Sequence, residues 1–202
     1  MGGRIGVFGG TFDPPHLGHV ILASEAVSQL RLTRLLWVLT ALPPHKTGTA
    51  VSSLKDRLAM VRSALADEPT FELSTVDIDR PGPHFTLDTL RLLRSQNPES
   101  DIILVLGGDS LHDLPGWHRP EEVVAACSEI GVMRRPGDEV DLSRLEEGLP
   151  GLRARLHFIT APLLQISSHE IRERAGKGLP FRHYVPRAVY EYIVAQRIYR
   201  GI

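Results

Sequence analysis

Short apolar runs alternate with longer amphipathic stretches along the chain. Most of the runs are rich in β-branched and large apolar residues and end at glycine or polar residues, which is typical of strands buried on both faces. The run at 71–79 is more polar and is expected to form an edge strand. The buried strands are predicted at 4–9, 35–40, 101–107, 129–134 and 156–160.

The stretches between these runs have the periodicity of helices. Apolar residues recur at spacings of three and four within 20–30 and within 54–65, which places them on one face of a helix. A third helix is predicted from Thr86, a favourable N-cap, to the residue before Pro98, and a fourth has Pro186 at its first position. Strands that alternate with helices predict an α/β fold, in which a mainly parallel sheet has helices on both faces.

The composition is that of one globular domain spanning residues 1–202. The chain has 42% hydrophobic and 23% charged residues, and it contains no internal repeat and no low-complexity segment. Its longer irregular connections, 41–53 and 108–120, are each followed directly by apolar elements, so neither is expected to be a linker.

The charge and the length of the apolar runs limit the expected partners. A formal net charge of −1 gives no electrostatic reason to expect nucleic acid or a membrane as a partner. No apolar stretch has the length of a signal-peptide core or of a membrane span. The single cysteine, Cys127, excludes an intrachain disulfide and is expected to be buried. We therefore expect a cytoplasmic protein, and the sequence leaves a homo-oligomer open.

The segment that follows the first predicted strand has the features of an anion-binding site. Gly9 and Gly10 allow the backbone to turn sharply or to approach a ligand closely. His16 and His19 would lie one turn apart at the start of the next helix, where unpaired N–H groups and the helix dipole bind phosphate. Gly18, between the two histidines, would let an oxyanion come close. Ligands of parallel sheets bind at the carboxyl ends of the strands, which is where this segment lies.

The spacing of the two histidines alone leaves other interpretations open. His16 and His19 could bind a metal, although no third ligand lies adjacent in the sequence, or they could be ordinary surface residues. The segment is not a Walker A loop and not a G-x-G-x-x-G dinucleotide motif, because neither spacing occurs in it.

The whole stretch "GGTFDPPHLGH" (9–19) resembles the N-terminal motif of the nucleotidyltransferases that carry H-x-G-H, which have a Rossmann-like, doubly wound α/β fold. Within that superfamily the chain is most similar to bacterial nicotinate-nucleotide adenylyltransferases. H-x-G-H alone indicates only the superfamily, and further segments that match in order over nearly the full chain make the resemblance more specific. These segments are "PPHK" (43–46), "FTLDTL" (85–90), "GGDS" (107–110), "LPGWHRPEE" (114–122) and "ISSHEIR" (166–172).

The resemblance implies a reaction in NAD biosynthesis, in which ATP and nicotinate mononucleotide give nicotinate adenine dinucleotide and pyrophosphate. The attacking phosphate is already largely anionic at neutral pH, since the second pKa of a phosphate monoester is about 6. We therefore expect no nucleophilic side chain and no covalent intermediate, but positioning and charge neutralisation. Mg²⁺ is expected to arrive with ATP, held mainly by phosphates and water. Nicotinamide mononucleotide, phosphopantetheine or a flavin nucleotide as acceptor, and a nucleotide-binding module without catalysis, are the alternatives.

The resemblance also implies roles for the matching residues. The catalytic group is expected to consist of His16, His19, Lys46 and Arg172, acting on the phosphates. The expected ATP-binding residues are Gly9, Gly10, Thr11, Phe12, His16, Gly18, His19, Gly107, Asp109, Ile166, Ser167, Ser168, His169 and Arg172, and the expected mononucleotide-binding residues are His45, Lys46, Phe85, Thr86, Trp117 and His118.

The mononucleotide contacts follow a simple chemical logic. The resemblance places the pyridine carboxylate at the backbone around Phe85 and Thr86, and N–H groups at a helix start favour a carboxylate over an amide. It also stacks Trp117 on the pyridine ring, with His118 beside it. Trp37 lies inside a predicted strand and is the better candidate for the core.

Structural roles compete with several of these assignments. Lys46 could be a solvated lysine, Asp109 could be a turn or cap residue, and Thr86 is expected to cap a helix whatever the function. Ser167 and Glu170 form an S-x-x-E capping box, which predicts that a helix begins there.

One position departs from the pattern of the family. The residue after the two serines of "ISSHEIR" is usually threonine there, and in this chain it is His169. We hypothesise that His169 donates to the triphosphate of ATP, so that ATP binds more tightly as the pH falls from about 7 to 6.

Overall fold

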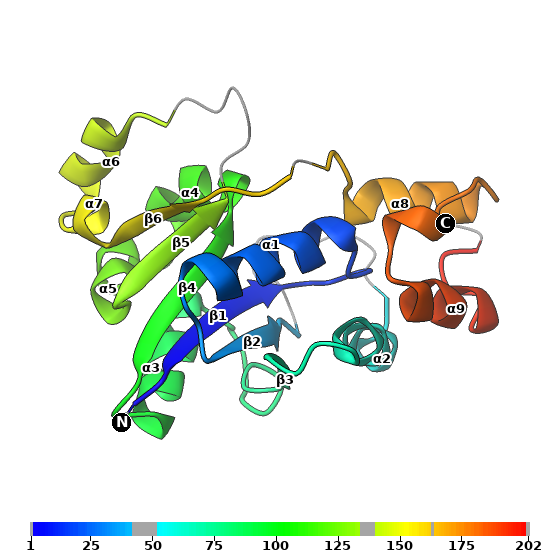
Figure 1. Cartoon of the computed structure of the whole chain (residues 1–202), viewed down its shortest axis with the longest axis horizontal. Helices are drawn as coiled ribbons and strands as arrows, with labels where there is room; N and C mark the ends of the chain where they lie inside the picture. Colours follow the sequence, from blue (N-terminus) through cyan, green and yellow to red (C-terminus); the bar gives the residue numbers. More distant parts are fainter. Residues whose placement is uncertain (1, 42–51, 134–139, 163, 201–202) are drawn as a thin grey trace.

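Six parallel strands form the central sheet of the computed structural model, which describes residues 2–41, 52–133, 140–162 and 164–200 (Figure 1). The strand order is β3-β2-β1-β4-β5-β6, so the chain winds outward in two directions from the adjacent strands β1 and β4. This order confirms the predicted Rossmann-like, doubly wound α/β fold. The strands are β1 (Arg4–Gly10), β2 (Arg34–Leu39), β3 (Phe71–Ser74), β4 (Asp101–Gly107), β5 (Glu129–Met133) and β6 (Leu156–Ile159).

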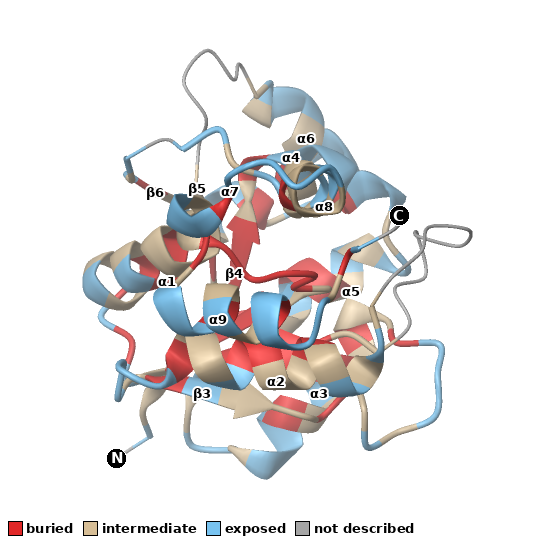
Figure 2. Cartoon of the chain, turned by 90° about the vertical axis from the view of Figure 1, so that its right-hand side faces the viewer, coloured by how far each residue is buried: buried red, intermediate tan, exposed pale blue. Residues whose placement is uncertain are grey.

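Helices cover both faces of this sheet because strand side chains alternate between two cores. Leu35 and Trp37 of β2 pack with residues of α1 and α2, and Trp37 is fully buried there, as predicted. Leu36 and Val38 pack on the other face with residues of α3 and α5. Figure 2 shows the buried strand β4 at the centre of the molecule. The helices are α1 (Leu17–Gln29), α2 (Leu54–Leu65), α3 (Thr86–Gln96), α4 (Gly108–Asp113), α5 (Pro120–Ala126), α6 (Leu142–Gly148), α7 (Leu152–Arg155), α8 (Ser168–Gly176) and α9 (Arg187–Ala195), with the 3₁₀ turns η1 (Leu114–Gly116) and η2 (Arg182–Tyr184).

A third apolar cluster joins the C-terminal helices to α2. Met60 of α2 packs in one cluster with Ile171 of α8 and Ile193 of α9. Tyr199, beyond α9, is buried in the same cluster. The hydroxyl of Tyr192 adds a 3.0 Å hydrogen bond to Oδ1 of Asp56 in α2. The end of the chain is therefore folded back against a helix that covers the sheet.

Strand β3 lies at the edge of the sheet, as predicted, but it is shorter than the predicted run 71–79. It ends at Ser74, because the residues that follow form a turn. The N–H groups of Ile78 and Asp79 both donate to the carbonyl oxygen of Thr75, and a chain bonded to itself in this way cannot continue to pair with β2.

Two helix starts also differ from the predictions by one residue. The N-cap of α3 is Phe85, so Thr86 is the first residue of the helix and not its cap. Pro186 is the N-cap of α9 and not its first residue, and the helix begins at Arg187.

Cys127, at the end of α5, is buried as the sequence predicts. Burial raises the pKa of its thiol to about 12, so the sulfur is a neutral packing group. Among the helices of the described ranges, none has both the length and the apolar character that a membrane crossing requires.

Candidate active site

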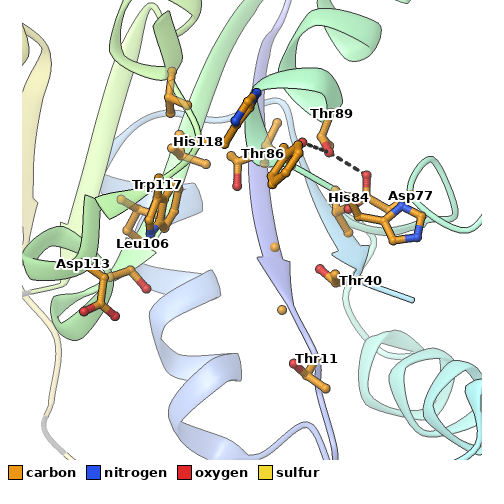
Figure 3. A pocket seen from close by; sticks show the side chains of 18 residues that line it. Thr11, Thr40, Asp77, His84, Thr86, Thr89, Leu106, Asp113, Trp117 and His118 are labelled. Atoms are coloured by element: carbon orange, nitrogen blue, oxygen red, sulfur yellow. Dashed lines mark hydrogen bonds between the residues drawn. The ribbon is translucent and has the colours of Figure 1, made fainter. Parts of the chain in front are cut away.

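A cavity of about 310 Å³ lies at the carboxyl ends of β1, β2 and β4 (Figure 3). The strand order reverses between β1 and β4, and α/β folds bind their ligands at such a point. The walls also include the start of α3 and the connection between α4 and α5. Of the residues predicted from the sequence, the cavity brings together Gly9, Gly10, Thr11, Phe85, Thr86, Trp117 and His118.

Gly9 and Gly107, at the ends of the neighbouring strands β1 and β4, have open space beside them. A Cβ atom added at either position would meet nothing within 4 Å beyond its chain neighbours. A Cβ atom on Gly10 would instead lie 2.8 Å from the ring of Phe12. Gly10 is therefore required by the packing of the protein, whereas Gly9 and Gly107 leave room for a ligand to approach the backbone.

The ring of Phe12 belongs to the core and not to the cavity. It is 2% exposed, and its centroid lies 4.9 Å from that of Trp37 and 5.2 Å from that of His19. The prediction that Phe12 binds ATP is therefore restricted to its backbone, because packing against these rings keeps the side chain away from any ligand.

His16 and His19 stack on each other at the start of α1, as residues one turn apart are expected to do. Their ring centroids are 3.6 Å apart. The backbone N–H of His16 donates a 3.2 Å hydrogen bond to Nδ1 of His19. Nδ1 is thus an acceptor, and the neutral His19 ring carries its proton on Nε2. An N–H group of this kind is a donor for a phosphate oxygen.

His16 is a buried and neutral imidazole. It is 7% exposed, and desolvation lowers its pKa to about 4, from an ordinary value of 6.5. Its Nδ1 has no hydrogen-bond partner among the described residues. A Cβ atom on Gly18 would lie 3.1 Å from that nitrogen. Gly18 therefore makes room for the His16 ring, and its close approach to an oxyanion stays a prediction.

Asp13 fixes the segment between β1 and α1 to two distant parts of the chain. Its carboxylate is buried and accepts a 2.7 Å hydrogen bond from the hydroxyl of Tyr199 and a 3.0 Å hydrogen bond from the N–H of Ser52. Burial and the charge of Asp13 raise the pKa of Tyr199 well above its ordinary value. The hydroxyl therefore stays protonated and remains a donor.

Arg57 of α2 connects the same segment to two others. Its side chain is buried and donates to backbone carbonyl groups on three segments of the chain. Two of these groups belong to residues that line the cavity, so Arg57 helps to set the shape of its wall. The acceptors are the carbonyl oxygens of Thr11 (3.3 Å), Thr40 (2.8 Å), Ala41 (2.8 Å) and Ser52 (3.2 Å).

The start of α8 is joined to the segment that precedes α1. Oγ of Ser168 donates a 2.9 Å hydrogen bond to the carbonyl oxygen of Pro14. Nη1 of Arg172 donates a 2.8 Å hydrogen bond to the carbonyl oxygen of Asp13. Two of the residues predicted to bind ATP therefore lie next to the histidine-bearing segment, although they come from the other end of the chain.

The remaining predicted residues of this region differ in what they contact. Oγ of Ser167 accepts a 3.1 Å hydrogen bond from the N–H of Glu170, which confirms that α8 begins with a side-chain cap. The side chain of His169 is 77% exposed, and its Nε2 lies 3.9 Å from a carboxylate oxygen of Glu173. Ile166 packs against the C-terminal apolar cluster.

Aromatic side chains give the cavity its apolar lining (Figure 3). The rings of Phe85 and His118 are stacked, with centroids 4.1 Å apart. Trp117 is partly buried and packs against the core beneath the cavity. Phe85, as N-cap of α3, offers no side-chain acceptor to the first N–H groups of that helix. An apolar slot with N–H groups at its rim suits a flat ring that bears an anionic group.

Asp109 is not among the residues that line this cavity. Asp109 is the second residue of α4 and is exposed at the same edge of the sheet. His45 and Lys46 lie outside the described residues, so their contacts with the mononucleotide stay predictions.

Several polar residues of the cavity were not found from the sequence. Asp77 and Thr89 illustrate the reason, since Oγ1 of Thr89 donates a 2.5 Å hydrogen bond to Asp77 across two elements that no spacing rule connects. The role of Arg57 behind the cavity wall could have been inferred from the sequence, because Arg57 is a charged residue on the apolar face of the helix 54–65. The cavity residues in question are Thr40, Asp77, His84, Thr89, Ser110 and Asp113.

Sequence comparisons give the relatives of the chain. Residues 7–174 match the family model described as cytidylyltransferase-like. A protein of Roseiflexus castenholzii named "Probable nicotinate-nucleotide adenylyltransferase" is 46% identical over 198 residues, which cover 98% of each chain. A protein of Thermomicrobium roseum with the same name is 43% identical over 199 residues, which cover 98% of this chain and 92% of the relative.

The fold is shared with a solved structure of lower identity. The nicotinic acid mononucleotide adenylyltransferase of Plasmodium falciparum complexed with NaAD superposes with a TM-score of 0.79 at 20% identity, over 98% of this chain and 97% of the other. The family model covers most of the chain, and each of the two relatives matches 98% of the chain. The chain therefore belongs to the nicotinate-nucleotide adenylyltransferases, within the cytidylyltransferase-like family.

Proposed function

We infer that the chain joins the AMP part of ATP to nicotinate mononucleotide, giving nicotinate adenine dinucleotide and pyrophosphate in NAD biosynthesis. The observation that carries this inference is the cavity itself. It places an aromatic lining and the uncapped start of α3 on one side, and the glycine-rich end of β1 on the other. A pyridine carboxylate suits the first of these regions and a phosphate the second.

The chemistry requires the protein to position two anionic substrates. The phosphate of the mononucleotide is the nucleophile and attacks the α-phosphorus of ATP, and the bond to the β-phosphate oxygen breaks to release pyrophosphate. The enzyme lowers the barrier by aligning these groups and by stabilising the charge that develops between them.

Donors from both ends of the chain supply that stabilisation. We propose that Nε2–H of His19 donates to the α-phosphate, and that neutral His16 supports the stacked pair. The start of α8, with Ser168 and Arg172, is proposed to hold the remaining phosphates, since both residues already lie beside the segment before α1. Lys46 is proposed to neutralise phosphate charge as well, on the resemblance alone.

A divalent cation accompanies ATP in reactions of this kind, and we propose Mg²⁺. Within the described ranges no group of three or more His, Cys, Asp and Glu side chains could form a metal cage. The proposal therefore places the cation on the phosphates and on water, which is the usual binding mode of Mg²⁺ with nucleotides.

A coupled pyrophosphate assay tests the proposed function. The purified chain is given ATP and Mg²⁺ with nicotinate mononucleotide, nicotinamide mononucleotide, a flavin nucleotide or phosphopantetheine as acceptor. We expect kcat/KM to be highest with nicotinate mononucleotide. Preferred turnover of another acceptor would contradict the proposed substrate, and absence of pyrophosphate with every acceptor would contradict catalysis.

A further inference from the structure

An ion pair lies directly behind the start of α3, in the wall of the cavity. Asp77 lines the cavity and its side chain is 5% exposed, whereas Arg80 lies behind it with 18% exposed. Nη2 of Arg80 donates a 3.0 Å hydrogen bond to Oδ1 of Asp77. The same oxygen accepts a hydrogen bond from Oγ1 of Thr89, which Figure 3 shows. A carboxylate is thus present beside the region to which the proposed function assigns a substrate carboxylate.

Arg80 also holds the backbone that leads into α3. Its Nη1 donates a 3.2 Å hydrogen bond to the carbonyl oxygen of Pro83, and its Nη2 a 3.3 Å hydrogen bond to that of Phe85. These bonds hold the carbonyl groups of Pro83 and Phe85 against the guanidinium of Arg80. The negative ends of their dipoles are then neutralised, and the N–H groups that follow at the start of α3 carry the local positive charge.

His84 adds a second polar group to the same part of the wall. It lines the cavity, is 8% exposed, and its Nδ1 has no hydrogen-bond partner among the described residues. A buried ring nitrogen without a partner is costly unless a ligand or water completes it. A polar group of the substrate that reached this nitrogen would supply the missing partner, in addition to the contacts made by the apolar surface of its ring.

We propose that Arg80 is a positioning residue that sets the preference of the cavity for an anionic ring substituent over a neutral one. This inference rests on the proposed function and deepens it. By pairing with Asp77, Arg80 cancels the charge that would otherwise repel a carboxylate at the cavity wall. By holding the carbonyls of Pro83 and Phe85, it orients the N–H groups that receive the carboxylate. Arg80 acts through these groups and does not itself line the cavity.

The charge pairing predicts opposite effects for the two partners. Arg80→Met leaves Asp77 unpaired, so we expect the acid-to-amide ratio of kcat/KM to fall by at least about tenfold, mainly through the KM for nicotinate mononucleotide. Asp77→Asn removes the negative charge and leaves Arg80 in place, so we expect the same ratio to rise. The double variant Asp77→Asn/Arg80→Met has neither charge, and its ratio is expected to lie between those of the single variants.

A matched control separates this effect from loss of structure. Arg34 holds the other end of α3, because its Nη2 donates to Oδ1 of Asn97 and its Nη1 to Oε2 of Glu72. Arg34→Met should therefore disturb the same helix without changing the acid-to-amide ratio. Arg80→Lys keeps a positive charge next to Asp77, so its acid-to-amide ratio of kcat/KM should stay closer to that of the unsubstituted chain than the ratio of Arg80→Met does.

The test measures kcat, KM and Kd for nicotinate and nicotinamide mononucleotides, with Kd from calorimetry without ATP. A lower acid-to-amide ratio of kcat/KM for Arg80→Met and a higher one for Asp77→Asn support the proposal. Ratios equal to that of the unsubstituted chain in both variants would overturn it. If Arg80→Met does not fold, Asp77→Asn decides alone, since an unchanged or lower ratio contradicts the charge pairing. Failure of the unsubstituted chain to use nicotinate mononucleotide would instead refute the proposed function.

Discussion

Oδ1 of Asp13 accepts a 2.7 Å hydrogen bond from the hydroxyl of Tyr199, a residue 186 positions further along the chain. Both residues are 3% exposed. The bond ties the segment before the stacked histidines to the last part of the chain. The position of the segment that leads into the histidines therefore depends on the docking of α8 and α9, and not on β1 and α1 alone.

Removal of the Tyr199 hydroxyl is expected to destabilise the protein. In Tyr199→Phe, Oδ1 of the buried Asp13 carboxylate loses a hydrogen-bond donor. A buried acceptor left without its partner lowers the free energy of unfolding by on the order of 1–3 kcal/mol. Urea denaturation measures the change in the free energy of unfolding.

Tyr192→Phe is the matched control for this substitution. It removes a tyrosine–aspartate bond of 3.0 Å between Tyr192 and Asp56, both of which are partly exposed. We expect this variant to lose less than about 1 kcal/mol, because water can replace the lost partner. Equal losses in the two variants would show that burial of Asp13 does not determine the strength of the Tyr199 bond.

The lowered pKa of His16 predicts that stability falls with acid. The folded protein holds this imidazole neutral down to a pKa of about 4, whereas the unfolded chain binds the proton near the ordinary value of 6.5. The contribution of neutral His16 to the free energy of unfolding is therefore fully present above about pH 6.5 and is lost as the pH falls toward 4. The total loss is on the order of 3 kcal/mol.

Denaturation curves between pH 7 and 5 measure this loss. Other groups titrate in the same range, so the comparison is between the unsubstituted chain and His16→Gln, which has no imidazole at this position. We expect the free energy of unfolding to fall by about 1–2 kcal/mol more in the unsubstituted chain over this range. Parallel profiles would mean that His16 is not held neutral by burial.

His19 is expected to act on the transition state. Its Nε2–H is proposed to donate to the α-phosphate as charge develops there, so His19→Ala should lower kcat by on the order of 10²–10³-fold. The variant should still fold, because His19 is not fully buried. Pyrophosphate release under saturating substrates measures kcat, and circular dichroism checks the fold. A kcat close to that of the unsubstituted chain would contradict the assigned role.

The sequence predicts the architecture well because buried parallel strands are encoded locally. Runs such as 101–107 are apolar on both faces, and only a strand covered by helices on each side buries such a run. The edge strand at 71–79 is less well predicted, because Thr75 forms a turn with the N–H groups of Ile78 and Asp79. A turn of this kind competes with strand pairing over a few residues and leaves little trace in the hydrophobic pattern.

The site is predicted only in part, and α3 shows why. A threonine before an amphipathic stretch normally caps the helix, yet Phe85 takes the cap position and leaves the first N–H groups without a side-chain acceptor. A departure from a local rule is expected at a functional site, where a ligand supplies the missing partner. Contacts such as that of Asp13 with Tyr199 join distant parts of the chain, so local pattern does not reveal them.

Trp117 is expected to contribute to one substrate only. In Trp117→Ala the pyridine ring would lose its stacking partner, and the KM for nicotinate mononucleotide should rise by at least about fivefold, which corresponds to about 1 kcal/mol. The KM for ATP should change little, since the start of α8 is proposed to hold phosphates of ATP and Trp117 is proposed to contact only the pyridine ring. Initial rates with each substrate varied in turn measure both constants. Equal increases in the two would place Trp117 away from the pyridine ring.

His169 is expected to make ATP binding depend on pH. Its side chain is largely exposed, so it can turn toward a triphosphate held at the start of α8, and Glu173 is the carboxylate that competes for it at 3.9 Å. A protonated imidazole adds positive charge beside the phosphates, and imidazoles in general take up a proton over a range that includes pH 7 to about 6. The KM for ATP should therefore fall over this range in the unsubstituted chain.

His169→Asn keeps a donor at this position but cannot take up a proton. Its ATP KM should change less with pH than that of the unsubstituted chain, and the difference between the two profiles isolates the imidazole from the titration of ATP itself. Glu173→Gln removes the competing carboxylate, so the imidazole is free to face the phosphates and the ATP KM should be lower at pH 6. Identical profiles for the unsubstituted chain and His169→Asn would show that His169 does not contact the triphosphate.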